Sequence, residues 1–196
     1  VLLPAALAAD RGEHLGVGLL GYALGRAGGR SYGELLQRRV LEPLGLDDTA
    51  ITLSPAQEAR FARGHDEFMR PTPPWQMGAL PGAGALRSSA SDMLDFLAAV
   101  LARPAGPLAE EFALTAAIRA GGDGGPLRGL GWLIAEFPSG VTLHHGGGTG
   151  GYRSHIAVQP DTRRAVVVLT DSAVEPGAGD LALHLIAGAP VAAEVP

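Results

Sequence analysis

The sequence predicts an α+β fold, with helices in the first half of the chain and an antiparallel sheet in the second. Apolar residues recur at helical spacing in the first half, and strand-like segments separated by short turns follow in the order of a meander. We therefore expect a mainly helical part, residues 1–120, with a long loop at 47–88. The sheet and a last helix are expected within residues 121–196.

Capping signals bound the first two expected helices. The first covers residues 15–27 and ends at two consecutive glycines, which commonly terminate helices. The second begins at Ser31, because Ser31 and Glu34 have the spacing of a capping box, and Pro43 and Gly45 are expected to stop it.

Residues 47–79 show little periodicity and contain several prolines, so they predict a long excursion over the surface. Excursions of this length in compact domains are often functional. Asp92 follows Ser89 at capping distance, and apolar residues then continue at helical spacing. A further helix is expected over residues 108–118, followed by a flexible connection at 121–125.

Four strands are expected in the second half, at residues 130–136, 141–145, 154–158 and 165–170. Residues 166–169 are all apolar, so we expect the last of these strands to be central and buried on both faces. A short helix over residues 181–186 closes the pattern.

The composition excludes several chemistries, because the sequence contains no cysteine, lysine or asparagine. A thiolate nucleophile, a Cys-ligated zinc, a Schiff-base lysine and a Ser–Lys dyad within this chain are ruled out. The net charge is −5 and no basic stripe occurs, which argues against a nucleic-acid partner. No apolar run approaches the ~18–20 residues that span a membrane. We expect neither a cofactor nor a metal, and the compartment and oligomeric state stay open.

Two short motif matches lack the structural context that their functions require. Residues 16–21 fit the dinucleotide-binding pattern G-x-G-x-x-G, but no strand precedes them. Ser31 lies in a G-x-S-x-G pattern, but a helix precedes it where a nucleophile elbow needs a strand. We interpret the first as a closely packed helix and Ser31 as a helix cap.

Residues 144–152 form the most informative motif, His-His-Gly-Gly-Gly-Thr-Gly-Gly-Tyr. A strand that runs into successive glycines exposes backbone N–H groups, which can stabilise a developing oxyanion or lie along an extended substrate. Strand alternation places Val141, Leu143 and His145 on one face and His144 on the other. A β-bulge and a turn that need positive φ explain the glycines equally well, and these residues alone leave both interpretations open.

Four segments resemble, in the same order, the serine β-lactamase-related hydrolases, which comprise class C β-lactamases, D-alanyl-D-alanine carboxypeptidases and related esterases. The segments are residues 15–22, 31–49, 81–93 and 145–152. The resemblance implies a β-lactamase/transpeptidase-like fold, in which an antiparallel sheet flanked by helices lies beside a helical subdomain. It also implies that the chain is a single partial domain, corresponding to the C-terminal portion of that fold without its N-terminal strands.

The resemblance implies a site at residues 145–152, which match the family's third motif. His145 then faces the site, the backbone N–H of Gly148 belongs to the oxyanion hole, and Gly146, Gly147 and Thr149 contact the substrate. Gly146 replaces a threonine that often helps to bind a substrate carboxylate, which favours esters or amides over penicillins. The remaining histidines, among them His144 and His155, are expected as surface or capping residues.

The family's other two motifs, Ser-x-x-Lys and Tyr-x-Asn, do not occur in the sequence. The resemblance therefore implies the C-terminal fragment of a serine hydrolase that hydrolyses a β-lactam, peptide or ester through an acyl-enzyme, and that is inactive alone. The alternative is a noncatalytic binding module or degenerate pseudoenzyme of the same fold. Without the N-terminal strands, we expect an unpaired sheet edge and an exposed apolar face.

Overall fold

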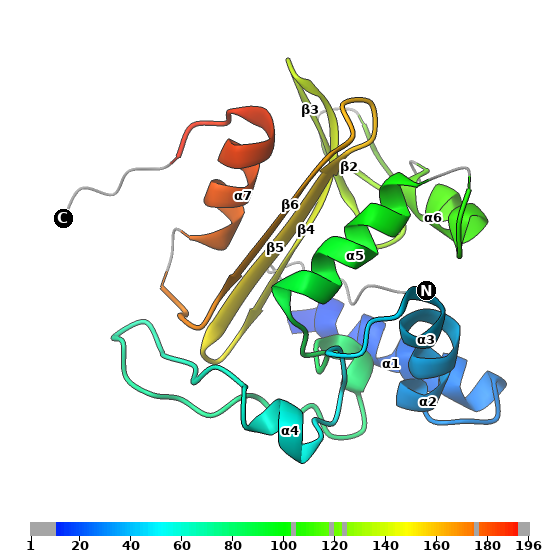
Figure 1. Cartoon of the computed structure of the whole chain (residues 1–196), viewed down its shortest axis with the longest axis vertical. Helices are drawn as coiled ribbons and strands as arrows, with labels where there is room; N and C mark the ends of the chain where they lie inside the picture. Colours follow the sequence, from blue (N-terminus) through cyan, green and yellow to red (C-terminus); the bar gives the residue numbers. More distant parts are fainter. Residues whose placement is uncertain (1–10, 103–104, 118–119, 123–124, 175–176, 192–196) are drawn as a thin grey trace.

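The computed structural model describes residues 11–102, 105–117, 120–122, 125–174 and 177–191, and it confirms the α+β fold. A six-stranded antiparallel sheet has strands in the order β1-β2-β3-β4-β5-β6. Helix α7 lies on one face of this sheet and α5 on the other, while the first helices gather to one side (Figure 1). Within the described ranges, no helix is long and apolar enough to cross a membrane.

The helices lie close to the expected positions. Their bounds are α1 (Arg11–Ala27), α2 (Tyr32–Leu36), α3 (Glu42–Leu44), α4 (Pro55–Glu58), α5 (Ala90–Leu101), α6 (Ala109–Ala116) and α7 (Ala178–Ala187), with a π-helical turn η1 (Gln37–Leu41) and a 3-10 turn η2 (Pro81–Ala83). The Ser31 hydroxyl accepts from the Glu34 N–H, and the Glu34 carboxylate accepts from the Ser31 N–H, which confirms the capping box. Gly45 ends the helical run at a φ of 67°, a left-handed conformation that glycine adopts without strain.

The sheet has six described strands, two more than the sequence predicted. Its strands are β1 (Ala120–Gly122), β2 (Gly125–Arg128), β3 (Leu133–Phe137), β4 (Gly140–Thr149), β5 (Tyr152–Gln159) and β6 (Arg164–Thr170). The segment 121–125, expected as a flexible connection, contributes to β1 and β2 wherever the structure describes it. Strands β4 and β5 pair without a register shift from Leu143↔Val158 to Thr149↔Tyr152.

The position expected for β6 is wrong. Among the described strands it pairs only with β5, so it lies at the edge of the sheet, and Leu169 is 41% exposed. A run of apolar residues indicates faces that pack, but it does not indicate how many strands stand beside it. The most buried strand is β5, the neighbour of β6, in which the residues from His155 to Gln159 are all buried. The unpaired edge agrees with the expectation of absent N-terminal strands.

The hydrophobic core lies between α5 and the face of the sheet that α5 covers. Leu97 and Val100 of α5 are fully buried against a cluster that includes Ile156 and Val158 of β5. Phe112 of α6 packs edge-to-face on Phe96, with ring centroids 5.5 Å apart. This packing holds α5 against the face of the sheet.

Candidate active site

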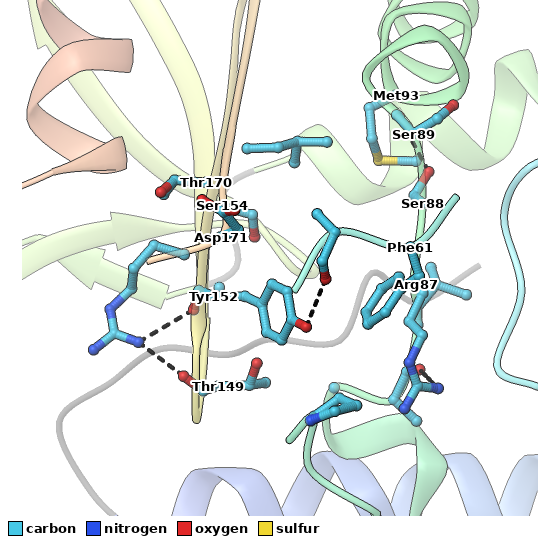
Figure 2. A pocket seen from close by; sticks show the side chains of 18 of the residues that line it. Phe61, Arg87, Ser88, Ser89, Met93, Thr149, Tyr152, Ser154, Thr170 and Asp171 are labelled. Carbon is cyan, nitrogen blue, oxygen red and sulfur yellow. Dashed lines mark hydrogen bonds between the residues drawn. The ribbon is translucent and has the colours of Figure 1, made fainter. Parts of the chain in front are cut away.

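A cavity of about 650 Å³ lies where β4 approaches the N-terminal end of α5 (Figure 2). Residues 145–149 of β4 form one wall. Parts of the long loop at 47–88, called the excursion from here on, form another wall. This agrees with the expectation that the segment does more than connect two helices. All five residues expected at the site line the cavity: His145, Gly146, Gly147, Gly148 and Thr149.

His145 is buried in this wall, with 7% of its surface exposed. Burial, and secondarily the neighbouring His144, lower the pKa of His145 from 6.5 to about 4. The ring is therefore neutral at neutral pH. Its Nε2 atom is buried and has no hydrogen-bond partner among the described residues. An unsatisfied buried nitrogen is unfavourable, so this atom marks a place where a further polar group would stabilise the site.

The first three glycines after His145 are required for space and not for a turn. None of Gly146, Gly147 and Gly148 has positive φ, and each continues the regular pairing of β4 with β5. A Cβ would lie 3.0 Å from His155 Nδ1 at position 146, and 2.6 Å from Ser154 Oγ at position 147. No bulge therefore occurs at residues 146–148, and the turn lies at Gly150 and Gly151, neither of which has positive φ.

One edge of β4 is uncovered beside the cavity. Strand β3 pairs with β4 only as far as Leu133↔His144, while β5 continues to pair up to Thr149. Within the described part of the chain, no strand therefore covers the β3 side of residues 145–149. Such an edge leaves backbone groups available to another chain or to a ligand.

Position 146 does not bear on carboxylate binding as expected. The Cβ direction of Gly146 points to His155, whose Nδ1 atom would also lie 3.3 Å from a Cβ at Gly179 of α7. A side chain at position 146 would therefore face α7 and not the cavity. Gly146 therefore gives no structural reason to disfavour carboxylate-bearing substrates.

His155 is not the surface residue that we expected. It is 8% exposed, and its Nε2 atom lies 3.2 Å from Nδ1 of His144, with the two rings stacked 5.3 Å apart. Burial, and secondarily the neighbouring histidines, lower the pKa of His155 to about 4. The hydrogen bond requires one neutral ring to donate and the other to accept. Gly146 and Gly179 leave the space that this ring occupies.

The excursion is fastened to the β4–β5 hairpin by close contacts. The Tyr152 hydroxyl donates to the Ala62 carbonyl at 2.9 Å, and the Phe61 ring lies 5.4 Å from the Tyr152 ring. Trp75 crosses the hairpin so closely that a Cβ at Gly150 would lie 2.5 Å from the indole nitrogen. The sequence did not lead us to expect these aromatic residues in the wall. The only feature that could have indicated them is Trp75, which follows two consecutive prolines.

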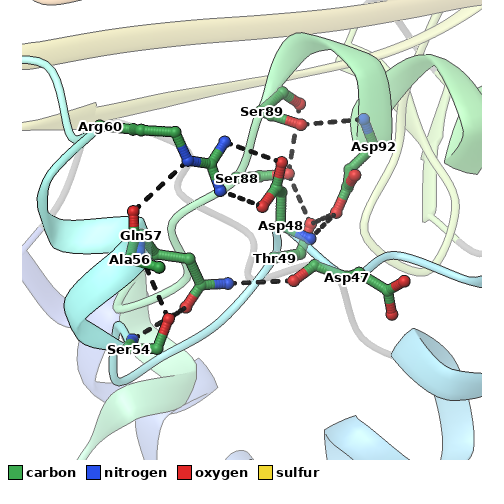
Figure 3. Close-up of polar contacts among 10 residues, drawn as sticks. All are labelled: Asp47, Asp48, Thr49, Ser54, Ala56, Gln57, Arg60, Ser88, Ser89 and Asp92. Atoms are coloured by element: carbon green, nitrogen blue, oxygen red, sulfur yellow. Dashed lines mark hydrogen bonds and ion pairs between the residues drawn. The ribbon is translucent and has the colours of Figure 1, made fainter.

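A polar network holds the excursion to the start of α5 (Figure 3). The Asp92 carboxylate accepts from the Asp48 N–H at 2.9 Å and from the Thr49 hydroxyl at 2.6 Å. The Thr49 hydroxyl also lies 2.7 Å from Ser88 Oγ, and Ser89 caps the helix by accepting from the Asp92 N–H. Because Ser88 and Ser89 line the cavity, this network determines the position of its wall.

The guanidinium groups in the cavity wall have different partners. Arg60 is paired with Asp48, and this hydrogen-bonded ion pair lowers the pKa of the Asp48 carboxyl. Arg87 donates to three backbone carbonyls and forms no ion pair with a described residue. Arg153 donates to the carbonyls of Thr149 and Tyr152. Among the described residues, no three His, Cys, Asp or Glu side chains cluster so that they could hold a metal.

Comparison with known proteins agrees with this geometry. The family model described as Beta-lactamase matches residues 13–189. The human protein "Putative beta-lactamase-like 1" is 36% identical over 70 residues, which cover 36% of this chain and 14% of the human protein.

Solved structures show the same fold. A class C beta lactamase from Rhodobacter sphaeroides has a TM-score of 0.76 and 24% identity, covering 83% of this chain and 55% of that chain. A D-alanine carboxypeptidase from Burkholderia cenocepacia has a TM-score of 0.75 and 20% identity, covering 83% and 56%. The octameric penicillin-binding protein homologue from Pyrococcus abyssi has a TM-score of 0.74 and 25% identity, covering 93% and 44%.

The chain thus spans about half the length of these solved structures. The family model covers most of the sequence, and the fold, the strand with the glycine run and the adjoining cavity are consistent with it. The chain belongs to the beta-lactamase family.

Proposed function

We propose that this chain forms the substrate-binding half of a serine hydrolase that acts through an acyl-enzyme. The single observation that supports this most is the uncovered edge of β4 at residues 145–149, which borders a cavity large enough for a small substrate. In acyl transfer, a hydroxyl gives its proton to a base and adds to the carbonyl carbon, and the carbonyl oxygen becomes an oxyanion. Backbone N–H groups on a preorganised strand stabilise that oxyanion in the transition state.

Under this proposal, the Gly148 N–H is one oxyanion donor and His145 is a neutral hydrogen-bonding group beside it. Gly146, Gly147 and Thr149 form the strand along which the substrate lies. The oxyanion then collapses, the leaving group departs with a proton, and water hydrolyses the ester of the nucleophile.

The nucleophile and its base are not among these 196 residues, because the sequence contains neither Ser-x-x-Lys nor any lysine. We therefore propose that the chain alone does not catalyse the reaction, and that a Ser-x-x-Lys segment acts together with it. Removing one oxyanion donor typically lowers a rate by ~10²–10³, but a donor without a nucleophile supports no covalent step.

Covalent labelling tests this proposal. The 196-residue protein is incubated with a fluorescent penicillin and with a nitrophenyl ester, and intact-mass spectrometry measures acylation. We expect no acylation of this protein, and acylation of a longer protein encoded by the same gene if it includes Ser-x-x-Lys. The matched control replaces that serine by alanine. Acylation of the 196-residue protein would contradict the proposal.

A noncatalytic binding module of the same fold is the second candidate. It is favoured by the neutral state of His145, because a neutral ring lacks the charge that a lysine would bring to this wall. Reversible ligand binding, without acylation of any longer protein from the gene, would support this candidate.

A further inference from the structure

Two histidine rings lie between the strand of the site and α7, on the face of the sheet opposite His145 (Figure 1). His155 is buried and His144 is half-buried, and His144 Nδ1 lies 3.2 Å from His155 Nε2. Cβ atoms at Gly146 of β4 and at Gly179 of α7 would lie 3.0 Å and 3.3 Å from His155 Nδ1. The His155 ring therefore fills the space between these two glycines and joins the strand of the site to the helix.

The hydrogen bond of this pair depends on how many protons the two rings carry. Two neutral rings hold two protons, one between His144 Nδ1 and His155 Nε2 and one on an outer nitrogen. A third proton must occupy the other outer nitrogen, so His155 Nδ1 then carries a hydrogen and the pair has a positive charge in the buried space beside Gly146 and Gly179. A fourth proton places hydrogens on both inner nitrogens and removes the hydrogen bond.

Among the described residues, no carboxylate is paired with these rings to balance such a charge. The other titratable or charged side chains of β4 and α7, and those of β5 and β6 on this face, are His145, Arg153, Arg164, Asp180 and His184. Asp180 is the one carboxylate of this set, and it forms no ion pair with either ring in the described structure. The N-terminal end of α7, which disfavours a cation, also lies beside His155. Burial lowers the pKa of both histidines of the pair.

Few large apolar side chains hold α7 on the sheet. Its buried residues are Ala178, Ala182 and Ile186, whereas Leu181 and Leu185 are 45% and 57% exposed. Elements with few buried apolar contacts open locally at a lower free energy than the whole fold. We therefore expect α7 to leave the sheet more readily than α5, which packs into the hydrophobic core.

We propose that the neutral His144–His155 pair is an acid-sensitive switch that holds α7 against the strand of the site, and that protonation of the pair releases this helix and the support of Gly146. The switch goes beyond the proposed hydrolase function and does not depend on it. His155 acts through the strand that carries the Gly148 N–H, so it is a positioning residue and not a catalytic one. Acid then loosens one wall of the cavity before the core unfolds.

Hydrogen exchange of the 196-residue protein at pH 7.5 and pH 5.5, followed by mass spectrometry, tests the proposal. Protection factors, corrected for the pH dependence of chemical exchange, report local opening. The pKa of His155 is lowered from 6.5 to about 4, so opening of the pair should become about tenfold more favourable over this range. We expect the protection of α7 and of residues 146–149 to fall by about that factor, and α7 to be less protected than α5 at both pH values. Equal protection of α7 and α5, or no fall in α7 or in residues 146–149, would overturn the proposal.

Substitutions identify the residues responsible. His155→Gln keeps a polar side chain that takes no proton in this pH range, so the fall in protection should shrink to about threefold or less. His144→Gln should also shrink it, and this variant decides the question if His155→Gln does not fold. His184→Gln is the matched control and should behave as the unsubstituted protein, because His184 lies on the exposed side of α7, with its Nδ1 atom 2.9 Å from the Ala189 carbonyl. An undiminished fall in the folded pair variants, or an equal reduction in His184→Gln, would refute the role of the pair.

Discussion

Replacing Asp92 by alanine should loosen the wall of the cavity and destabilise the whole fold. Asp92 is 7% exposed and its Oδ2 atom accepts both the Asp48 N–H and the Thr49 hydroxyl. The substitution leaves the Asp48 N–H without an acceptor and leaves the Thr49 hydroxyl with Ser88 Oγ alone, in a site that water enters poorly. It also removes an acidic residue from the first turn of α5, where the helix dipole favours negative charge.

The structure sets the magnitude of this effect. Hydrogen bonds to a charged group contribute about 1.5–3 kcal/mol each, so the loss of two predicts a destabilisation of about 3–5 kcal/mol. Asp92→Asn keeps an oxygen at the same place and loses the charge, so we expect a smaller cost of about 1–3 kcal/mol. Thr49→Val removes one of the two donors and should cost about 1–2 kcal/mol.

Urea unfolding followed by circular dichroism measures these differences as changes in the free energy of unfolding. In the double variant Asp92→Ala/Thr49→Val, the two effects should not add, because one substitution removes the partner that the other has already lost. A cost below about 1 kcal/mol for Asp92→Ala, or additive effects in the double variant, would refute the role assigned to this network.

Three further predictions concern the sheet and its histidines. The pKa values of His145 and His155 are lowered from 6.5 to about 4, so the free energy of unfolding should be at its full value above pH 6.5 and should fall as pH is lowered toward 4. In urea unfolding experiments at several pH values, His155→Gln should flatten this pH dependence. The control His184→Gln should not. Gly147→Ala should destabilise the fold by about 1 kcal/mol, because its Cβ meets Ser154 Oγ, and Ser154→Ala in the same chain should restore the stability. Leu97→Ala should cost about 2–5 kcal/mol in the same assay, since Leu97 is fully buried, whereas Leu94→Ala on the exposed side of α5 should cost far less.

Local signals in the sequence predicted the helices well, because each depends on residues a few positions apart. The Ser31–Glu34 box and the Ser89 cap are contacts over three residues, and both form as expected. His145 could likewise be placed in the wall of the site from the motif that it begins. These predictions required no knowledge of which segments meet in space.

The errors concern contacts between segments that are distant or paired across strands. The glycine run was open to two interpretations, because the side chains that need its space, Ser154 and His155, come from the next strand. The apolar run in β6 could not show that this strand pairs with a neighbouring strand on one side only. The surroundings of Arg87 gave no signal either, since the carbonyls of Ile51 and Trp75 and the ring of Phe61 come from distant positions in the sequence.

Burial keeps the His145 ring neutral near pH 7, because it lowers the pKa of the ring from 6.5 to about 4. A histidine of ordinary pKa would lose its proton as pH rises through about 6.5, but His145 has already lost it at that pH. Any contribution of His145 to ligand binding in the cavity should therefore stay constant between about pH 6 and pH 8.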